Sequence, residues 1–143
     1  ERNRMHDFVR NMIKFRHEHR YAFAPGDYGE SAPFTWKNPS NFDQSGDDWN
    51  TKRLMQHYHD ASAGEEIVIL INMENQDVEF TLPGGRTWKR VVDTQKFFDT
   101  DSYVEGQGME KTKTANFSAD GPILDATYVA TPQSMVIAVA VTE

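Results

Sequence analysis

The stretch Glu66-Ile-Val-Ile-Leu-Ile-Asn-Met73 decides the fold class of this chain of 143 residues. It is apolar on both alternating faces and rich in β-branched residues, which is typical of a central strand that is covered on two sides. The stretch from Met135 to Val141 has the same character. Both runs are far shorter than the roughly 20 apolar residues that span a bilayer. They therefore predict two core strands in a two-layer packing and no membrane helix.

Segments around these two runs alternate apolar and polar residues with a period of two, as half-buried strands do. The alternation is clear from Leu54 to His59 and from Val78 to Leu82, and short strands also fit Phe34 to Lys37 and Thr87 to Asp93. Pro83-Gly-Gly85 has the composition of a turn between antiparallel neighbours. The sequence therefore predicts a hairpin at that turn.

The N-terminal segment has a helical period instead. Its apolar residues are Met5, Phe8, Val9, Met12, Ile13 and Phe15, with Arg and Lys residues between them. This spacing predicts one amphipathic helix from about Asn3 to His19. We divide the chain into a helical segment at 1–24, a linker with short strands at 25–52, and a β-domain at 53–143.

About seven or eight short strands with turn signals between them predict a mainly β fold, an antiparallel β-sandwich preceded by the helix. The interval from Asp93 to Asp125 is long for a loop in a compact domain, so we expect one or two further short strands in it. The core should include apolar residues from four different strands. They are Ile69, Phe80, Val92 and Ile137.

Composition excludes several classes of function. The chain has 15 Lys and Arg residues against 22 Asp and Glu, a formal net charge of −7. This balance disfavours nucleic acid and anionic membranes as partners, because both require a basic field. The absence of cysteine excludes disulfides, thiol catalysis and thiolate metal sites, and it leaves the compartment undecided.

Four stretches, taken in order, resemble the end of isoamylase-type glycoside hydrolases of the α-amylase superfamily. The first is Phe8-Val-Arg-Asn-Met-Ile-Lys-Phe-Arg-His-Glu-His19, which is similar to that family's last barrel helix. The others are Phe34-Thr-Trp-Lys-Asn-Pro39 with Asp48-Trp-Asn50, Ile67 to Leu82-Pro83 with Trp88-Lys-Arg-Val-Val-Asp-Thr94, and Tyr128-Val-Ala-Thr-Pro-Gln-Ser134. The resemblance spans nearly the whole chain.

The resemblance implies a C-terminal β-sandwich of a debranching enzyme that hydrolyses α-1,6-glucosidic bonds of glycogen or starch. That reaction needs a carboxylate nucleophile and a carboxylic acid, which lie on barrel strands. Both groups would be upstream of this chain, so we expect no catalytic residue and no cofactor here. The expected partner is the catalytic barrel of the same polypeptide, which the β-domain would support.

A glucan-binding module is the alternative function, since exposed aromatic rings stack on sugars. Trp36, Trp49 and Tyr58 are the candidate carbohydrate contacts. Exposed aromatics in one plane would mark such a module. A core position is the competing interpretation for any aromatic on a strand, and it is favoured for Trp88.

Three other patterns imitate functional sites. His6 and Asp7 resemble a catalytic pair but lie within the helical pattern, where residues at i and i+1 do not face each other. His57 and His59 share a strand face without an evident third metal ligand. The segment that begins at Asn41 imitates a calcium loop, but its twelfth position is Lys52 where a Glu is required. We therefore expect no metal.

The apolar stripe of the helix needs a cover. Its exposed area would exceed what a monomer usually shows. Two covers are open at this point: the helix folds back on the β-domain, or it pairs with a second copy in a two-fold dimer.

Overall fold

The computed structural model describes residues 2–26, 28, 32–60, 64–95 and 122–141. Helix α1 covers Arg2–Glu18, α2 covers Arg20–Phe23, and the 3-10 helix η1 covers Gly46–Asn50. The strands are β1 Phe34–Lys37, β2 Arg53–Asp60, β3 Glu65–Asn72, β4 Val78–Thr81, β5 Trp88–Asp93, β6 Thr127–Ala130 and β7 Ser134–Ala140. The predicted mainly β fold with antiparallel sheets and a preceding helix is confirmed.

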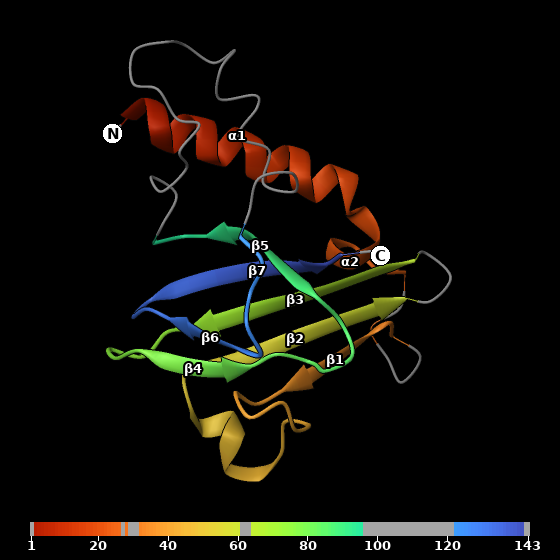
Figure 1. Ribbon diagram of the computed structural model, residues 1–143, viewed down its shortest axis with the longest axis vertical. Helices are drawn as coiled ribbons and strands as arrows, with labels where there is room; N and C mark the ends of the chain where they lie inside the picture. The colour runs from red at the N-terminus through yellow and green to blue at the C-terminus, as the bar shows by residue number, and fades with distance from the viewer. Residues whose placement is uncertain (1, 27, 29–31, 61–63, 96–121, 142–143) are drawn as a thin grey trace.

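The strands form two antiparallel sheets (Figure 1). The larger sheet has five strands in the order β1-β2-β3-β7-β5, and the smaller pairs β4 with β6. The two runs that are apolar on both faces, β3 and β7, are therefore neighbours near the middle of the larger sheet, as predicted. In the part of the chain that is described, no helix is long and apolar enough to cross a membrane.

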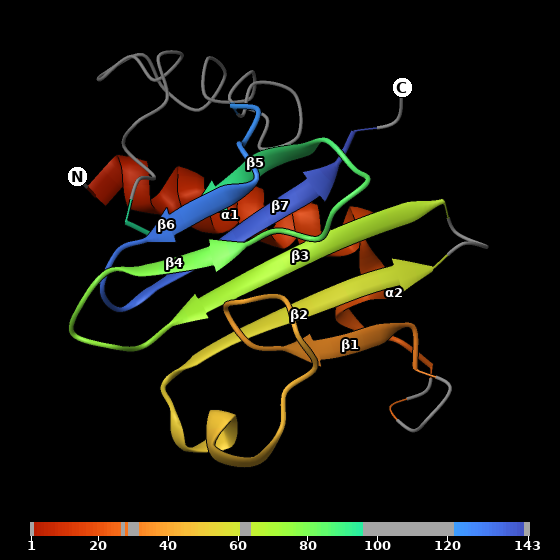
Figure 2. The same ribbon diagram turned by 60° about the horizontal axis from the view of Figure 1, so that its bottom comes forward.

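The larger sheet is covered on both faces, which explains why β3 has no polar residue from Ile67 to Ile71. Figure 2 shows β4 and β6 in front of this sheet and α1 behind it. Val68 and Leu70 of β3 pack in one cluster with Phe80 of β4. Ile67 and its neighbours on the opposite face pack in a second cluster with Phe15 of α1. Alternate side chains of one strand thus fill two apolar layers.

The four predicted core residues are all buried. Phe80 and Ile137 have no exposed surface, Val92 is 2% exposed and Ile69 is 9% exposed. The predicted core is confirmed at these positions. Most of the expected interval from Asp93 to Asp125, including any further strand at 96–121, lies outside the described residues.

The predicted hairpin at Pro83-Gly-Gly85 is wrong. β4 pairs with β6 and β5 pairs with β7, so the chain crosses from the smaller sheet to the larger one at this turn. The crossover is held by backbone acceptors, since Trp88 Nε1 donates to the Pro83 carbonyl at 2.8 Å and the Leu82 amide donates to the Ala126 carbonyl at 2.9 Å. Turn residues reverse the chain but do not select which strands then pair.

Helix α1 folds back on the larger sheet, which is one of the two covers expected from the sequence. Phe15 is only 2% exposed, and Phe8 and Met12 pack against the same apolar cluster. At the far end of the helix, His19 Nδ1 lies 2.8 Å from Glu65 Oε1 of β3. Residues from all three predicted segments contribute to one folded unit, because β1 of the linker pairs with β2.

Candidate functional site

The three predicted carbohydrate contacts lie in different environments. Trp36 on β1 is 37% exposed and Trp49 on η1 is 57% exposed, so both rings reach solvent. Tyr58 is only 2% exposed and belongs to the cluster beneath α1. The prediction for Tyr58 is therefore wrong, because its position opposite Phe34 and Ile67 places the ring in the core.

Trp36 is part of a row of aromatic rings along β1 that continues to Tyr28. The ring centroids of Phe34 and Trp36 are 5.5 Å apart at 77°, and those of Tyr28 and Phe34 are 6.2 Å apart at 65°. Neighbouring rings meet edge to face, which is a favoured packing geometry for aromatic pairs. The row therefore lacks the coplanar neighbouring rings that would mark a glucan platform.

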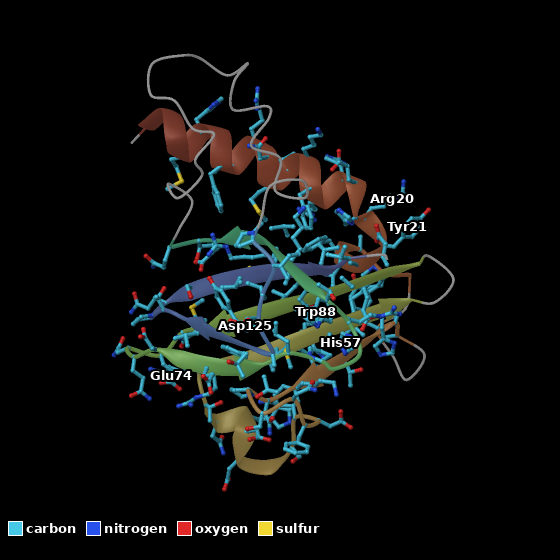
Figure 3. All side chains as sticks on the ribbon, viewed as in Figure 1. Arg20, Tyr21, His57, Glu74, Trp88 and Asp125 are labelled. Carbon is cyan, nitrogen blue, oxygen red and sulfur yellow. The ribbon has the colours of Figure 1, made fainter. Side chains whose placement is uncertain are left out.

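A polar cluster that includes His57 lies on the opposite face of the same sheet, and Figure 3 labels His57 and the neighbouring Trp88. His57 and Glu66 are bonded through Nε2 and Oε1 at 2.8 Å, and Arg86 Nε donates to the other carboxylate oxygen of Glu66. The ring centroids of His57 and Trp88 are 6.0 Å apart. The cluster joins β2 and β3 to the crossover that leads into β5.

The predicted common face of His57 and His59 is confirmed, since their ring centroids are 5.1 Å apart. His59 Nε2 is engaged with Thr35 Oγ1 at 3.2 Å. Among the described residues, no group of three or more His, Asp or Glu side chains is placed to hold a metal ion.

Burial and hydrogen bonds together set the charges in this cluster. Burial lowers the pKa of His57, and the charges of His59 and Lys37 act in the same direction, while the hydrogen bond to Glu66 and its charge only partly oppose them. Burial also acts to raise the pKa of Glu66, but the hydrogen bonds from His57 and Arg86 outweigh it and leave that pKa below its ordinary value. The folded state therefore favours a neutral imidazole beside an ionised carboxylate.

We expect the stability of the fold to fall as the pH drops below 6.5, the ordinary pKa of His57. In the window below 6.5 the unfolded chain binds a proton that the folded His57 does not, so unfolding becomes more favourable. Glu66 adds a further loss below 4.5, its ordinary pKa, through the same difference in proton binding. Urea unfolding between pH 8 and pH 4, as a rough range for His and Glu titration, measures both effects.

The matched pair of variants is His57→Gln and His17→Gln. His57→Gln should flatten the loss of stability near pH 6.5, whereas His17→Gln, which changes an exposed imidazole on α1, should keep it because His57 is still present. Equal slopes for the wild type and His57→Gln would contradict the assignment to His57.

A second polar cluster joins the two sheets. Tyr128 of β6 donates its hydroxyl hydrogen to Asp93 Oδ2 of β5, and Arg90 Nη1 donates to the Tyr128 oxygen at 3.2 Å. Burial and the hydrogen bond to Asp93 raise the pKa of Tyr128 to about 12. Asp93 is 4% exposed and also accepts the Gln95 amide at 3.0 Å. This carboxylate is used to hold the two sheets together.

The segment that imitates a calcium loop forms the cap of η1. Asp48 Oδ2 accepts the Ser45 amide at 3.2 Å and the Asn38 side chain at 3.3 Å, as a capping residue does. Asp43 is paired with Lys37, with Oδ1 and Nζ 3.5 Å apart. The carboxylates of Asp48 and Asp43 therefore stabilise this turn.

The pair His6-Asp7, which resembles a catalytic pair in sequence, lies on α1, and the His6 side chain is exposed.

Helix α1 has an exposed apolar flank beside the buried one. We name it the outer stripe and define it as Met5, Val9 and Ile13. These side chains are 48%, 47% and 55% exposed, respectively. The sequence pattern placed the buried and exposed residues in one stripe, and only docking on the sheet separates them.

Sequence reasoning missed Glu66, Arg86, Asp93 and Tyr128. Their signal was weak, because each is a polar residue at the end of a strand or in a turn, where such residues are common. Their roles depend on which residues of other strands come to lie beside them. His57 and Glu66 are separated by nine positions, and Tyr128 and Asp93 by 35.

No protein-family model matches the chain, and no curated protein matches it.

Proposed function

We propose that this chain is a non-catalytic, supporting β-domain of an isoamylase-type debranching enzyme and that it contacts the catalytic barrel through α1. The four stretches of resemblance suggest the family. The structural observation that supports the proposal is that the apolar surface of α1 is wider than its own sheet covers. One flank packs on the sheet of this chain, and the other flank, the outer stripe, is exposed.

The outer stripe has the geometry of a helix packing surface. Met5, Val9 and Ile13 are four residues apart, so they lie above one another on one side of the helix. A helix that only covers its own sheet requires an apolar stripe no wider than the covered surface, with polar residues elsewhere. The exposed flank of this wider stripe suits a helix that also packs on a second domain.

The polar clusters fit a supporting role. Retaining hydrolysis of glycosidic bonds uses two carboxyl groups that are free to reach the sugar, about 5 to 5.5 Å apart. Here the partly buried Glu66 is bonded to His57 and Arg86, and the buried Asp93 is bonded to Tyr128 and the Gln95 amide. Both carboxylates are engaged in holding strands together.

The test is complementation of an isoamylase-type barrel that is truncated before its last helix. The chain should bind this fragment and raise its midpoint of thermal unfolding, because α1 restores the missing cover. The variant carrying Val9→Asp and Ile13→Asp should lose binding, since two charges replace the apolar contact. Calorimetry and a debranching assay on amylopectin measure the two outcomes, and the chain alone should release no sugar.

The control variant carries Ile123→Asp and Val129→Asp, two apolar residues outside the helical segment that are 60% and 45% exposed. It should bind the barrel fragment as the wild type does. Failure of the wild type to bind the fragment would refute the proposal. Binding of soluble glucan with micromolar affinity, lost in Trp36→Ala or Trp49→Ala, would favour the glucan-binding module instead.

A further inference from the structure

We propose that the outer stripe of α1, with Arg16 and the start of α2, docks on a protein surface whose apolar centre is bordered by carboxylates. The inference names the chemistry of the partner at the surface used by the proposed function, and it rests on that function only for the identity of the partner. Three observations support it: the position of Arg16, the charge of the helical segment, and the exposed Arg20 and Tyr21.

Arg16 continues the outer stripe. It follows Ile13 by three positions and Val9 by seven, and residues at these spacings share one side of a helix. Its side chain is exposed. The carboxylate of Glu18 lies on another side, where its Oε1 is 3.6 Å from Lys14 Nζ. A partner that covers the apolar part of the stripe therefore meets a guanidinium at its end.

The charge of the helical segment is opposite to that of the whole chain. Residues 1–24 contain six Lys or Arg residues and three Asp or Glu, a formal balance of +3, whereas the chain carries −7. Complementary charge accelerates association and selects the partner. An acidic partner surface therefore complements the basic helical segment. The rest of the chain is acidic, so it repels an acidic partner outside this segment.

The surface extends past the end of α1 onto α2. Tyr21 is 61% exposed, and the Arg20 guanidinium carbon lies 6.0 Å from the centre of its ring. Figure 3 shows both side chains pointing outward at the start of α2. Tyrosine and arginine are the residue types that most often dominate binding energy at protein interfaces. They provide an anchor beside the stripe.

The charge of the helical segment also argues against two other occupants of this surface, a second copy of the chain and a membrane. Isologous pairing of two copies through the stripe would bring two basic segments together, which is repulsive. An anionic bilayer would attract the segment but repel the rest of the chain, because the net charge is −7. The apolar stripe has three aliphatic or thioether side chains, which suits a groove on a protein.

The probe is a pair of synthetic amphipathic helical peptides with Leu at every fourth position. One peptide has Glu at the flanking positions and the other has Lys. The full chain should bind the Glu peptide at least about tenfold more tightly than the Lys peptide, as measured by fluorescence anisotropy. The preference should shrink when salt rises from about 0.1 M to about 1 M, because the Debye length falls from about 10 Å to about 3 Å.

Variants assign the binding to the surface. Val9→Asp with Ile13→Asp should abolish binding of the Glu peptide, whereas Ile123→Asp with Val129→Asp should preserve it. Arg16→Glu with Arg20→Glu should reverse the preference towards the Lys peptide, and Arg16→Lys with Arg20→Lys should retain it. Circular dichroism checks that each variant keeps the strand content of the wild type.

Several results would overturn the inference. Equal binding of the two peptides, or no binding of either, would exclude a carboxylate-bordered partner. Tighter binding to phosphatidylserine vesicles than to the Glu peptide would assign the surface to a membrane, and a dimer in light scattering that Val9→Asp dissociates would assign it to a second copy. If the barrel fragment fails to bind while the Glu preference holds, the proposed function is wrong and this inference stands.

Discussion

Phe80→Ala should lower the free energy of unfolding by about 3 to 5 kcal/mol, the usual cost of truncating a buried Phe. Phe80 has no exposed surface and lies between the two sheets, in contact with the cluster that contains Val68 and Leu70. Its removal leaves a cavity where the smaller sheet packs on the larger one. A small domain is stable by about 5 to 15 kcal/mol, so the variant loses a large part of its stability.

Urea unfolding followed by circular dichroism measures this loss. The control is Val129→Ala on β6, which is 45% exposed and pairs with Glu79 beside Phe80. The control should change the free energy of unfolding by no more than about 0.5 kcal/mol. A loss below about 1 kcal/mol for Phe80→Ala would show that the two sheets do not share this core.

Phe15→Ala should also cost about 3 to 5 kcal/mol. Phe15 is 2% exposed and contacts the rings of His19 and Phe23, with centroids 4.2 Å and 5.8 Å away. Among the α1 side chains that the structure describes it is the most deeply buried, and it belongs to the cluster that includes Tyr58 and Ile67. The loss measures how strongly the helix is held on the sheet.

Ile13→Ala is the matched control on the same helix. Ile13 is 55% exposed, so its truncation should change the free energy of unfolding by no more than about 0.5 kcal/mol. Equal losses for Phe15→Ala and Ile13→Ala would contradict the two-faced helix. A small loss for both would mean that α1 does not pack on the sheet in solution.

The contrast between these helix variants bears directly on the proposed partner surface. Substitutions on the buried face should change stability, whereas substitutions on the outer stripe should change binding and leave stability almost unchanged. This separation lets the outer stripe be altered without unfolding the domain. It also explains why Val9 and Ile13 are preferred to Phe8 and Met12 as test positions.

Local periodicity was enough to determine the elements and much of the core. The helix at Arg2–Glu18 was predicted from its spacing at about Asn3 to His19, because side-chain direction repeats every 3.6 residues in a helix. The strand at Glu65–Asn72 was predicted at Glu66 to Met73 from its unbroken run of apolar, β-branched residues. Because β3 is apolar on both of its faces, the sequence also predicted that both faces are covered. These features depend on neighbours within one element.

Only the tertiary structure decided which strands pair and which aromatic rings reach solvent. Pro83-Gly-Gly85 reads as a hairpin turn, yet β4 pairs with β6 across a long stretch of chain. Tyr58 and Trp36 have similar strand contexts, but Tyr58 lies in the cluster beneath α1 and Trp36 lies on the edge strand. Pairing and burial depend on the elements that arrive from elsewhere in the chain.

The candidate interface shows the same division. The sequence determined that residues 5–15 form an apolar stripe and that this stripe needs a cover. It did not determine that the sheet covers Phe8, Met12 and Phe15 while Met5, Val9 and Ile13 stay exposed. The angle at which a helix meets a sheet is set by packing of both surfaces, and a helical period contains no information about the second surface.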